Sequence, residues 1–321
     1  MAHELYLMED GTYSMCRAVN TASSWHGLEN VVPTDAPFET WLDRSGMGFE
    51  IKGSKVLYDV DGDQASMDDR KVLFRTDTNK ALSVVSTDYH IVQPYQVLNF
   101  FRDLCDKYGL EMDTAGCIRG GVKFWALART GTELNVGKGK DIIKQYILLA
   151  SSADASMATT AKHTTMRVVC SNTFHASINN GESAIKVSHS KAFNANDVKM
   201  DLGLLNDEFE QFGYFAGTMH DSKVTDPMAR KWFAEMLSGK NDLDTDQINT
   251  YASTSRLFQT IFDSYKQGKG AENTVWGLFN AVTYTVDHVR GRTVDSQLDS
   301  SMFGTGAQLK QKAWNKALAL V

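Results

Sequence analysis

The chain has 321 residues, of which 42% are hydrophobic and 10% aromatic, enough apolar material for one large domain or two ordinary ones. Its four scattered cysteines, with no Cys-x-x-Cys pair, and the lack of an apolar leader predict a protein of a reducing cytoplasm rather than a secreted one. No stretch approaches the roughly 20 consecutive apolar residues that a membrane-spanning helix needs, so a membrane-embedded protein is not expected.

The formal net charge of −6 is unevenly distributed along the chain. The segment 119–191 holds ten cations and four anions, a net charge of +6, which leaves −12 for the remainder. A basic surface of this kind is typical of proteins that bind nucleic acid, although cations and anions can equally pair across a fold. Both interpretations stay open at this point.

The N-terminal 40 residues predict an extended segment followed by a short helix at 37–44. From Gly48 onward, short runs at 49–51, 55–60, 71–75 and 81–86 alternate with Gly and Asp, which predicts the strands of an antiparallel meander. Asp59, Asp61 and Asp63 could suggest a nuclease metal site, but Gly62 favours a tight turn.

Pro94 begins a segment in which Leu98, Phe101 and Leu104 recur at helical spacing until Gly109, which predicts an amphipathic helix. Strands are then expected at 118–128 and 142–150, joined by a polar hairpin tip at 130–141. Extended runs at 165–170 and 184–188 complete the predicted sheet.

After about Phe193 the apolar period is helical, with helices expected at 225–239, 245–266, 274–290 and 307–320. The fold class predicted is therefore α+β, an antiparallel β-meander sheet with a packed helix followed by a helical C-terminal layer. We expect residues 1–192 to form a mixed core with a basic hairpin and residues 193–321 to pack on the same body.

Common catalytic motifs do not match. The loop from Gly131 to Gly137-Lys138 has one residue too many for a P-loop, and Gly304-Thr305-Gly306 fits a turn before the last helix better than a dinucleotide fingerprint. There is no zinc-ligand spacing and no nucleophile elbow, so no cofactor, metal or catalytic residue is predicted. The histidines of the basic segment, His163, His175 and His189, are expected to be structural.

The most informative segment is 142–177, where a polar turn at 151–156 and the run 167–173 follow apolar strands. Hydroxyl groups, amides and an arginine at strand ends can hold phosphate oxygens, and aromatic residues can stack on bases. Candidate stacking residues are Phe124, Trp125, Tyr146 and Phe174. A buried core role for Trp125 and a structural network around Arg167 and Asn172 remain alternatives.

The run Arg167-Val168-Val169-Cys170-Ser171-Asn172-Thr173 resembles the signature of a phage/plasmid-like family catalogued as a domain of unknown function, number nine hundred and thirty-two in its series. Further segments resemble the pattern of the same family in the same order: Trp25-His26-Gly27-Leu28, 88–94, Thr274-Val275-Trp276-Gly277, Asn280-Ala281-Val282-Thr283, Asp287-His288, and Phe303-Gly304-Thr305-Gly306 with Lys310 and Ala313. One departure is Ala155, where the family usually has glycine.

The resemblance implies a phage or plasmid protein of replication, recombination or counter-defence. The order of meander, helix and basic hairpin more remotely resembles single-strand annealing recombinases, which assemble into rings with DNA in a basic groove; this likeness concerns topology.

We therefore expect a non-catalytic protein that binds and anneals single-stranded DNA as a homo-oligomer, possibly a ring. The predicted nucleic-acid-binding residues are Arg119, Lys123, Arg129, Lys138, Lys140, Lys144, Lys162, Arg167 and Asn172. Two alternatives remain: a protein-interaction or counter-defence module, and an enzyme with an unfamiliar site around Asp154, His163, Arg167, Asn172 and His189.

Overall fold

The structure, a computed structural model, describes residues 5, 7–20, 29–33, 35–137, 141–167, 172–174, 184–203, 207–268, 272–291 and 294–321. The chain forms two compact units that interleave along the sequence. Unit 1 comprises Met1–Gly131, Tyr146–His163 and Glu182–Leu205, and unit 2 comprises Thr132–Gln145, Thr164–Gly181 and Asn206–Val321. The expected division into 1–192 and 193–321 remains a prediction.

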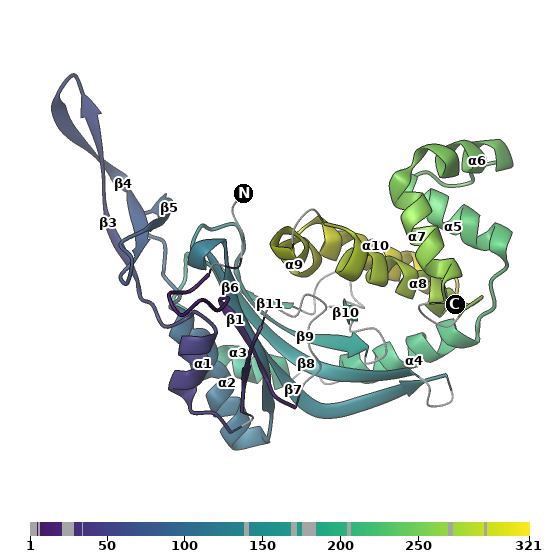
Figure 1. Ribbon diagram of the computed structural model, residues 1–321, viewed down its shortest axis with the longest axis horizontal. Coiled ribbons are helices and arrows are strands. Elements are labelled where there is room, and N and C mark those ends of the chain that lie inside the picture. Colours follow the sequence, from purple (N-terminus) through teal and green to yellow (C-terminus); the bar gives the residue numbers. More distant parts are fainter. Residues whose placement is uncertain are drawn as a thin grey trace. The chain divides into compact units, whose positions relative to one another are not determined.

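The α+β fold class is confirmed (Figure 1). The larger sheet has the strand order β10-β9-β8-β7-β6-β1-β2, and β11 pairs with β9. Its strands are β1 Met15–Ala18, β2 Asn30–Val32, β6 Glu111–Ile118, β7 Lys123–Val136, β8 Asp141–Ser152, β9 Thr159–Arg167, β10 Asn172–Phe174 and β11 Ala184–Val187. Strands β6 to β9 follow one another in both sequence and space, as a meander requires, whereas β1 and β2 pair in parallel.

The predicted strand at 118–128 was wrong in its boundaries. The structure places a turn at Arg119–Gly121 between β6 and β7, so the hairpin reverses inside the expected strand. Gly120 and Gly121 have φ values of 68° and 100°, which glycine adopts without steric cost. Strand β7 also continues to Val136, so the hairpin tip is shorter than the predicted 130–141.

The helices of unit 1 are α1 Phe38–Arg44, α2 Pro94–Tyr108 and α3 Ala195–Gly203. Helix α2 begins at Pro94, as predicted, behind a capping box formed by Gln93 and Gln96, and it ends at Gly109, whose φ is 67°. Its apolar face, with Phe100 and Phe101 almost fully buried, belongs to one core cluster with Phe124 and Leu149 of the sheet. The packed helix of the predicted fold is therefore α2.

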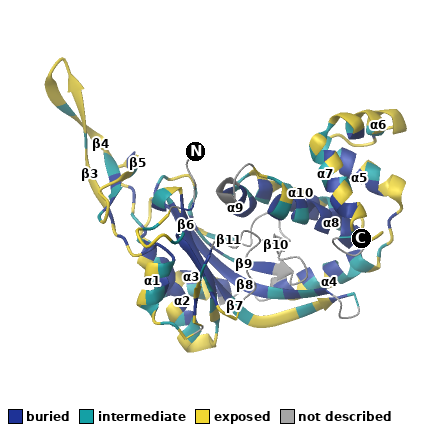
Figure 2. Ribbon diagram, in the orientation of Figure 1, coloured by how far each residue is buried: buried dark blue, intermediate teal, exposed yellow. Residues whose placement is uncertain are grey.

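A second sheet of unit 1 contains β3 Ile51–Val60, β4 Asp63–Arg75 and β5 Ala81–Ser86, in that order. The predicted tight turn is confirmed, because Asp61 and Gly62 connect β3 to β4 with φ values of 55° and 96°. Strand β4 begins at Asp63 rather than at Lys71. Its first residues lack apolar alternation because both faces of the strand are exposed there (Figure 2).

Unit 2 contains the C-terminal helices: α4 Asp207–Asp221, α5 Asp226–Ser238, α6 Thr245–Thr254, α7 Arg256–Lys266, α8 Val275–Tyr284, α9 Val294–Met302 and α10 Thr305–Leu318. The single helix predicted at 245–266 is two helices, because Ser255 leaves the helical conformation and its hydroxyl accepts a hydrogen bond from Phe258 N. None of the helices within the described ranges is long and apolar enough to cross a bilayer.

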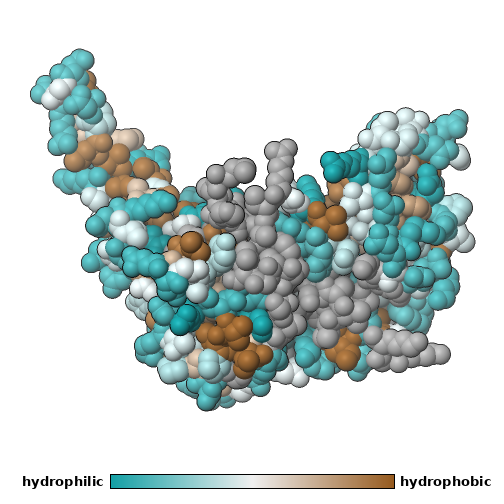
Figure 3. Space-filling model, viewed as in Figure 1, coloured by the Kyte–Doolittle hydropathy of each residue, from teal (hydrophilic) through white to brown (hydrophobic). Residues whose placement is uncertain are grey.

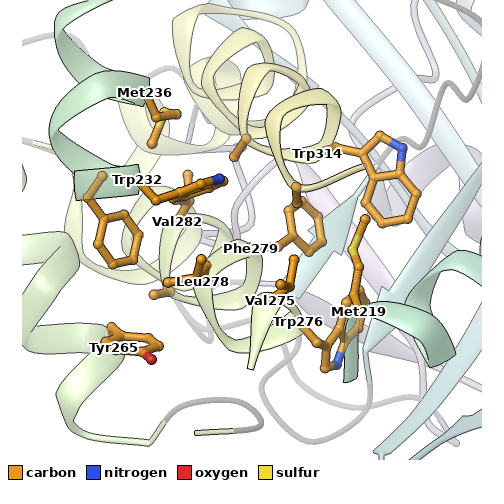
Figure 4. Close-up of a cluster of buried hydrophobic side chains, with 14 of the residues drawn as sticks. Met219, Trp232, Met236, Tyr265, Val275, Trp276, Leu278, Phe279, Val282 and Trp314 are labelled. Carbon is orange, nitrogen blue, oxygen red and sulfur yellow. The ribbon is translucent and has the colours of Figure 1, made fainter. Parts of the chain in front are cut away.

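The core of unit 2 is rich in aromatic side chains (Figure 4). Phe212 stacks on Trp314 with ring centroids 4.9 Å apart, and Phe279 meets the same indole edge-on at 5.3 Å. The indole N–H of Trp276 donates to the buried carboxylate of Asp141 at 2.8 Å. This core therefore joins α4, α8 and α10 to the start of strand β8.

A buried ion pair lies beside this core. Lys310 Nζ of α10 and Asp287 Oδ1 are 2.8 Å apart, and their side chains are 2% and 4% exposed. Asp287 belongs to a π-helical turn, Thr285–Val289, that continues α8, and its carbonyl accepts a hydrogen bond from Gln297 of α9. One charged pair thus connects the π-helical turn to the last helix.

Replacing Lys310 with methionine should lower the free energy of unfolding by about 3–5 kcal/mol, because the Asp287 carboxylate would stay buried without its cation. Urea denaturation of the purified chain measures this. Lys266→Met is the matched control: Lys266 and Asp226 also lie 2.7 Å apart, but both side chains are about half exposed. That control should cost less than about 1 kcal/mol, and equal losses in the two variants would contradict the prediction.

Candidate nucleic-acid interface

The edge of the larger sheet at β9 and β11 brings two lysines onto one face. The two strands are antiparallel, with Lys162 opposite Ala184 and Lys186 opposite Thr160. Directly opposed residues share a face, so Lys162 and Lys186 lie on the same face as diagonal neighbours. The Cα atoms of such neighbours are roughly 7–8 Å apart. Lys186 is exposed and Lys162 is half-buried.

The opposite face of the same two strands is apolar and covered. Ala161 and Ile185, which are cross-strand partners, belong with Val198 and Leu202 of α3 to the core cluster of unit 1. The lysine face, by contrast, contains Thr160 and Ala184 beside Lys162 and Lys186. Strand alternation therefore separates a helix-covered face from a cationic face.

Lys186 was counted in the basic segment but was absent from the predicted site. The signal was present in the sequence, because Lys186 stands between the apolar residues Ile185 and Val187 in an alternating run. Among the residues that the structure describes, Lys186 forms no ion pair. Lys186 also lines a surface hollow with Lys191, Asp197 and Asp201.

Several predicted cations already have carboxylate partners. Arg129 contacts Glu111 at 2.6 Å and Asp113 at 3.6 Å, which balances its charge on the strands β6 and β7. Lys144 lies 3.2 Å from Glu133 on the neighbouring strand. A paired cation gains less from phosphate than an unpaired one, because the existing pair must be broken.

The remaining predicted residues occupy varied positions. Arg119 is exposed at the turn between β6 and β7, whereas Lys123, at the start of β7, is buried and 7% exposed. The backbone register pairs Arg167 of β9 with Asn172 of β10, so these two positions are adjacent. Lys138 and Lys140 lie outside the described residues.

Three of the four candidate stacking residues are in the core, which confirms for them the core role that the sequence also allowed. Phe124, Trp125 and Tyr146 are exposed by 0%, 1% and 4%. Both faces of strand β7 are covered over 123–128, so a large side chain there cannot reach a base (Figure 2). The side chain of Phe174 lies outside the described residues.

The polar turn at 151–156 satisfies its own hydrogen bonds. The Ser152 hydroxyl donates to the Met157 carbonyl, and Ser151 bonds to the Thr159 hydroxyl at 2.8 Å. Tyr89 donates its phenol to the Ser152 carbonyl at 2.6 Å. These groups fix the corner between β8 and β9, and the buried hydroxyls of Ser151 and Ser152 are not presented to phosphate.

Asp154 caps this turn. Its carboxylate accepts a hydrogen bond from Ser156 N at 3.0 Å. Burial acts to raise the pKa of Asp154, but hydrogen bonds from Ser156 and Ser152 and the nearby charge of Lys123 together lower it below its usual value. The positive charge of Lys123 therefore helps to stabilise the ionised carboxylate of Asp154 at the corner between β8 and β9.

The histidines of the proposed enzymatic site also have structural partners. Burial lowers the pKa of His163, whose ring lies 3.3 Å from the Leu202 carbonyl. His189 stacks on Tyr89 with ring centroids 4.4 Å apart, and its nitrogens face the carbonyls of His90 and Met157 at 3.1 and 3.2 Å. Within the described ranges, no group of three His, Cys, Asp or Glu side chains could hold a metal ion.

Residues that carry the family resemblance also build unit 2. Strand β10, which holds Asn172 and Thr173, contacts helix α8, which holds Trp276 and Asn280. Gly306, at the start of α10, leaves no room for a side chain, because a Cβ atom would lie 2.8 Å from Ser300 O and from Val286. Gly306 therefore has a packing role.

A family model described as "Domain of unknown function (DUF932)" matches residues 81–308. The chain belongs to this family. The match covers β5, the whole meander β6 to β9 and the helices from α2 to the start of α10. No curated protein and no solved structure matches the chain.

Ala155 occupies a position where the conformation favours glycine, since its φ is 58°. Ala155→Gly should raise the free energy of unfolding by up to about 1 kcal/mol, because the relief of left-handed strain exceeds the added entropy of the unfolded chain. Chemical denaturation measures this. Ala153→Gly is the control: Ala153 is buried at 2% exposure in the same turn without a positive φ, so its replacement should destabilise. A loss of stability in both variants would contradict the conformational argument.

Proposed function

We propose that the protein binds and anneals single-stranded DNA as a homo-oligomer of phage or plasmid origin, acting in recombination or replication without covalent catalysis. The observation that supports this proposal is the pair Lys162 and Lys186 on one face of β9 and β11, opposite the face that α3 covers. Two neighbouring cations on one face of a sheet edge form a site that attracts phosphates.

Annealing requires only that the protein neutralise phosphates and leave bases free to pair. The lysine face meets the first requirement. Three of the candidate stacking residues are buried, so the protein would hold single-stranded DNA by its sugar-phosphate backbone. The base edges would then stay exposed to a complementary DNA strand. Arg119, exposed at the turn between β6 and β7, is a further candidate phosphate contact in unit 1.

A protein partner is the second candidate, and one observation favours it. Leu57, Tyr58, Val60 and Met67 on β3 and β4 are 43–52% exposed, within a segment that carries negative charge. Exposed apolar side chains in such number mark interaction surfaces. If the protein shows no affinity for DNA even at low salt, this candidate takes precedence.

The test is fluorescence anisotropy of a labelled single-stranded oligonucleotide at low and moderate salt, with duplex DNA as competitor. The wild-type chain should bind single-stranded DNA more tightly than duplex DNA. Lys162→Ala with Lys186→Ala should weaken binding and reduce the slope of log affinity against log salt by about 1.4, since each lost phosphate contact removes about 0.7.

The matched control variant has the same net charge as the Lys162→Ala, Lys186→Ala variant. Lys231→Ala with Lys266→Ala removes two lysines that pair with Glu235 and Asp226 on the helices of unit 2, and it should leave the affinity close to that of the wild type. Equal losses in the two double variants would remove the lysine face from the proposal. A wild-type chain that fails to bind or to anneal complementary strands would overturn the function itself.

A further inference from the structure

The hairpin of β3 and β4 forms an exposed arm, which we define as residues 56–67. From 52 to 70 every residue is exposed or half-buried, so neither face of this two-stranded ribbon is covered within unit 1 (Figure 2). Hydrophobic side chains are visible along it in Figure 3. An isolated two-stranded ribbon is marginally stable in water, so an arm of this kind gains stability from a partner.

The register gives the arm one apolar face. Val56 is opposite Met67 and Tyr58 is opposite Ala65, and opposed residues point to the same side of an antiparallel pair. Val60 follows on this face by strand alternation. The other face carries Leu57 and Asp59, opposite Ser66 and Gln64.

Strand β3 is also an edge. In the order β3-β4-β5 it has a neighbour on one side only among the described residues. Val60 and Asp63 flank the two-residue turn and so form a hydrogen-bonded pair, and such pairs alternate along an antiparallel ladder. The backbone groups of Leu57 and Asp59 therefore point away from β4, ready to pair with another strand.

The charge of the arm limits which kind of partner can bind it. Residues 56–67 include three aspartates, Asp59, Asp61 and Asp63, and no cation, a charge that repels the phosphates of a nucleic acid. Lys55 stands just before this segment, and in the described part of the chain neither Lys55 nor Asp59 has an ion-pair partner. On β3 the two lie four residues apart with Leu57 midway between them, and the register with β4 shifts between Lys55 and Val56. Asp59 Oδ1 accepts a hydrogen bond from Gly62 N at 3.1 Å, which leaves its second carboxylate oxygen for a cation.

We propose that the outer edge of β3 pairs with β3 of a second copy of this chain, antiparallel about a two-fold axis at Leu57. In this register Lys55 of each copy lies opposite Asp59 of the other, which forms two cross-strand ion pairs. Leu57 meets its own counterpart, and the outward N–H and C=O groups of Leu57 and Asp59 gain partners.

The pairing also extends the apolar face. Val56 and Tyr58 of one copy lie beside Tyr58 and Val56 of the other, so a two-stranded ribbon becomes part of a four-stranded sheet with a continuous hydrophobic side. A two-fold contact of this type uses the same surface twice and closes on itself. The inference rests on the assembly part of the proposed function and is independent of DNA binding.

Charge reversal tests the register directly in the full-length chain. Asp59→Lys and Lys55→Asp each place like charges opposite one another, so each should weaken self-association at least tenfold, measured by sedimentation velocity over a range of concentrations. The double variant Lys55→Asp with Asp59→Lys restores both pairs with reversed polarity and should return the dissociation constant to near the wild-type value.

A cross-link gives a second readout. Leu57→Cys should form a disulfide-linked dimer on mild oxidation, because hydrogen-bonded pairs place Cα atoms about 5.5 Å apart, within disulfide range. The control is Gln64→Cys, an exposed position opposite Asp59 on β4 and one strand away from the proposed edge. It should remain largely uncross-linked under the same conditions.

Two results would overturn the inference in distinguishable ways. A wild-type chain that is monomeric at all concentrations removes both the arm contact and the proposed assembly. A wild-type oligomer that the single reversals leave intact, with no cross-link at position 57, removes the arm contact alone. Circular dichroism of each variant checks that the fold is retained. We expect it to be retained, because the substituted side chains are exposed.

Discussion

Burial of both faces of the central strands is the constraint on which much of the structure depends. In β7 six consecutive residues from Lys123 to Ala128 are buried, and β8 is buried throughout from Gln145 to Ser152. A strand of this kind cannot present alternate side chains to solvent. Aromatic residues such as Trp125 therefore pack in the core, and ligand contacts are confined to sheet edges and turns.

The same constraint explains how the basic segment is divided. Lys123 is buried close to the carboxylate of Asp154, and Arg129 is balanced by two acidic residues of β6. At the sheet edge formed by β9 and β11, one face carries Lys162 and Lys186 while the other meets α3. Net charge along a sequence thus overstates the cationic surface, because part of it is used for pairing inside the fold.

Two surfaces of unit 1 have opposite chemistry. The lysine face suits an anionic polymer, and the β3–β4 arm, acidic and partly apolar, suits a protein edge. The proposed function assigns the first surface to nucleic acid, and the proposed self-association assigns the second to a neighbouring copy. In unit 2, the buried pair Lys310–Asp287 and the aromatic cluster around Trp314 instead give a rigid core.

By itself, the sequence determined the α+β class, the helix from Pro94 to its stop at Gly109, the turn at Asp61-Gly62 and the family, because caps, turn residues and motif order are local signals. Only the tertiary structure decided the break at Arg119–Gly121, the full length of β4 and the separation of α6 from α7. It also decided which cations are paired, since Arg129 and Asp113, or Lys310 and Asp287, lie apart in sequence and meet only through packing. Long-range pairing leaves no local pattern, which is why the charged residues of a site could be named from the sequence but their ion-pair partners could not.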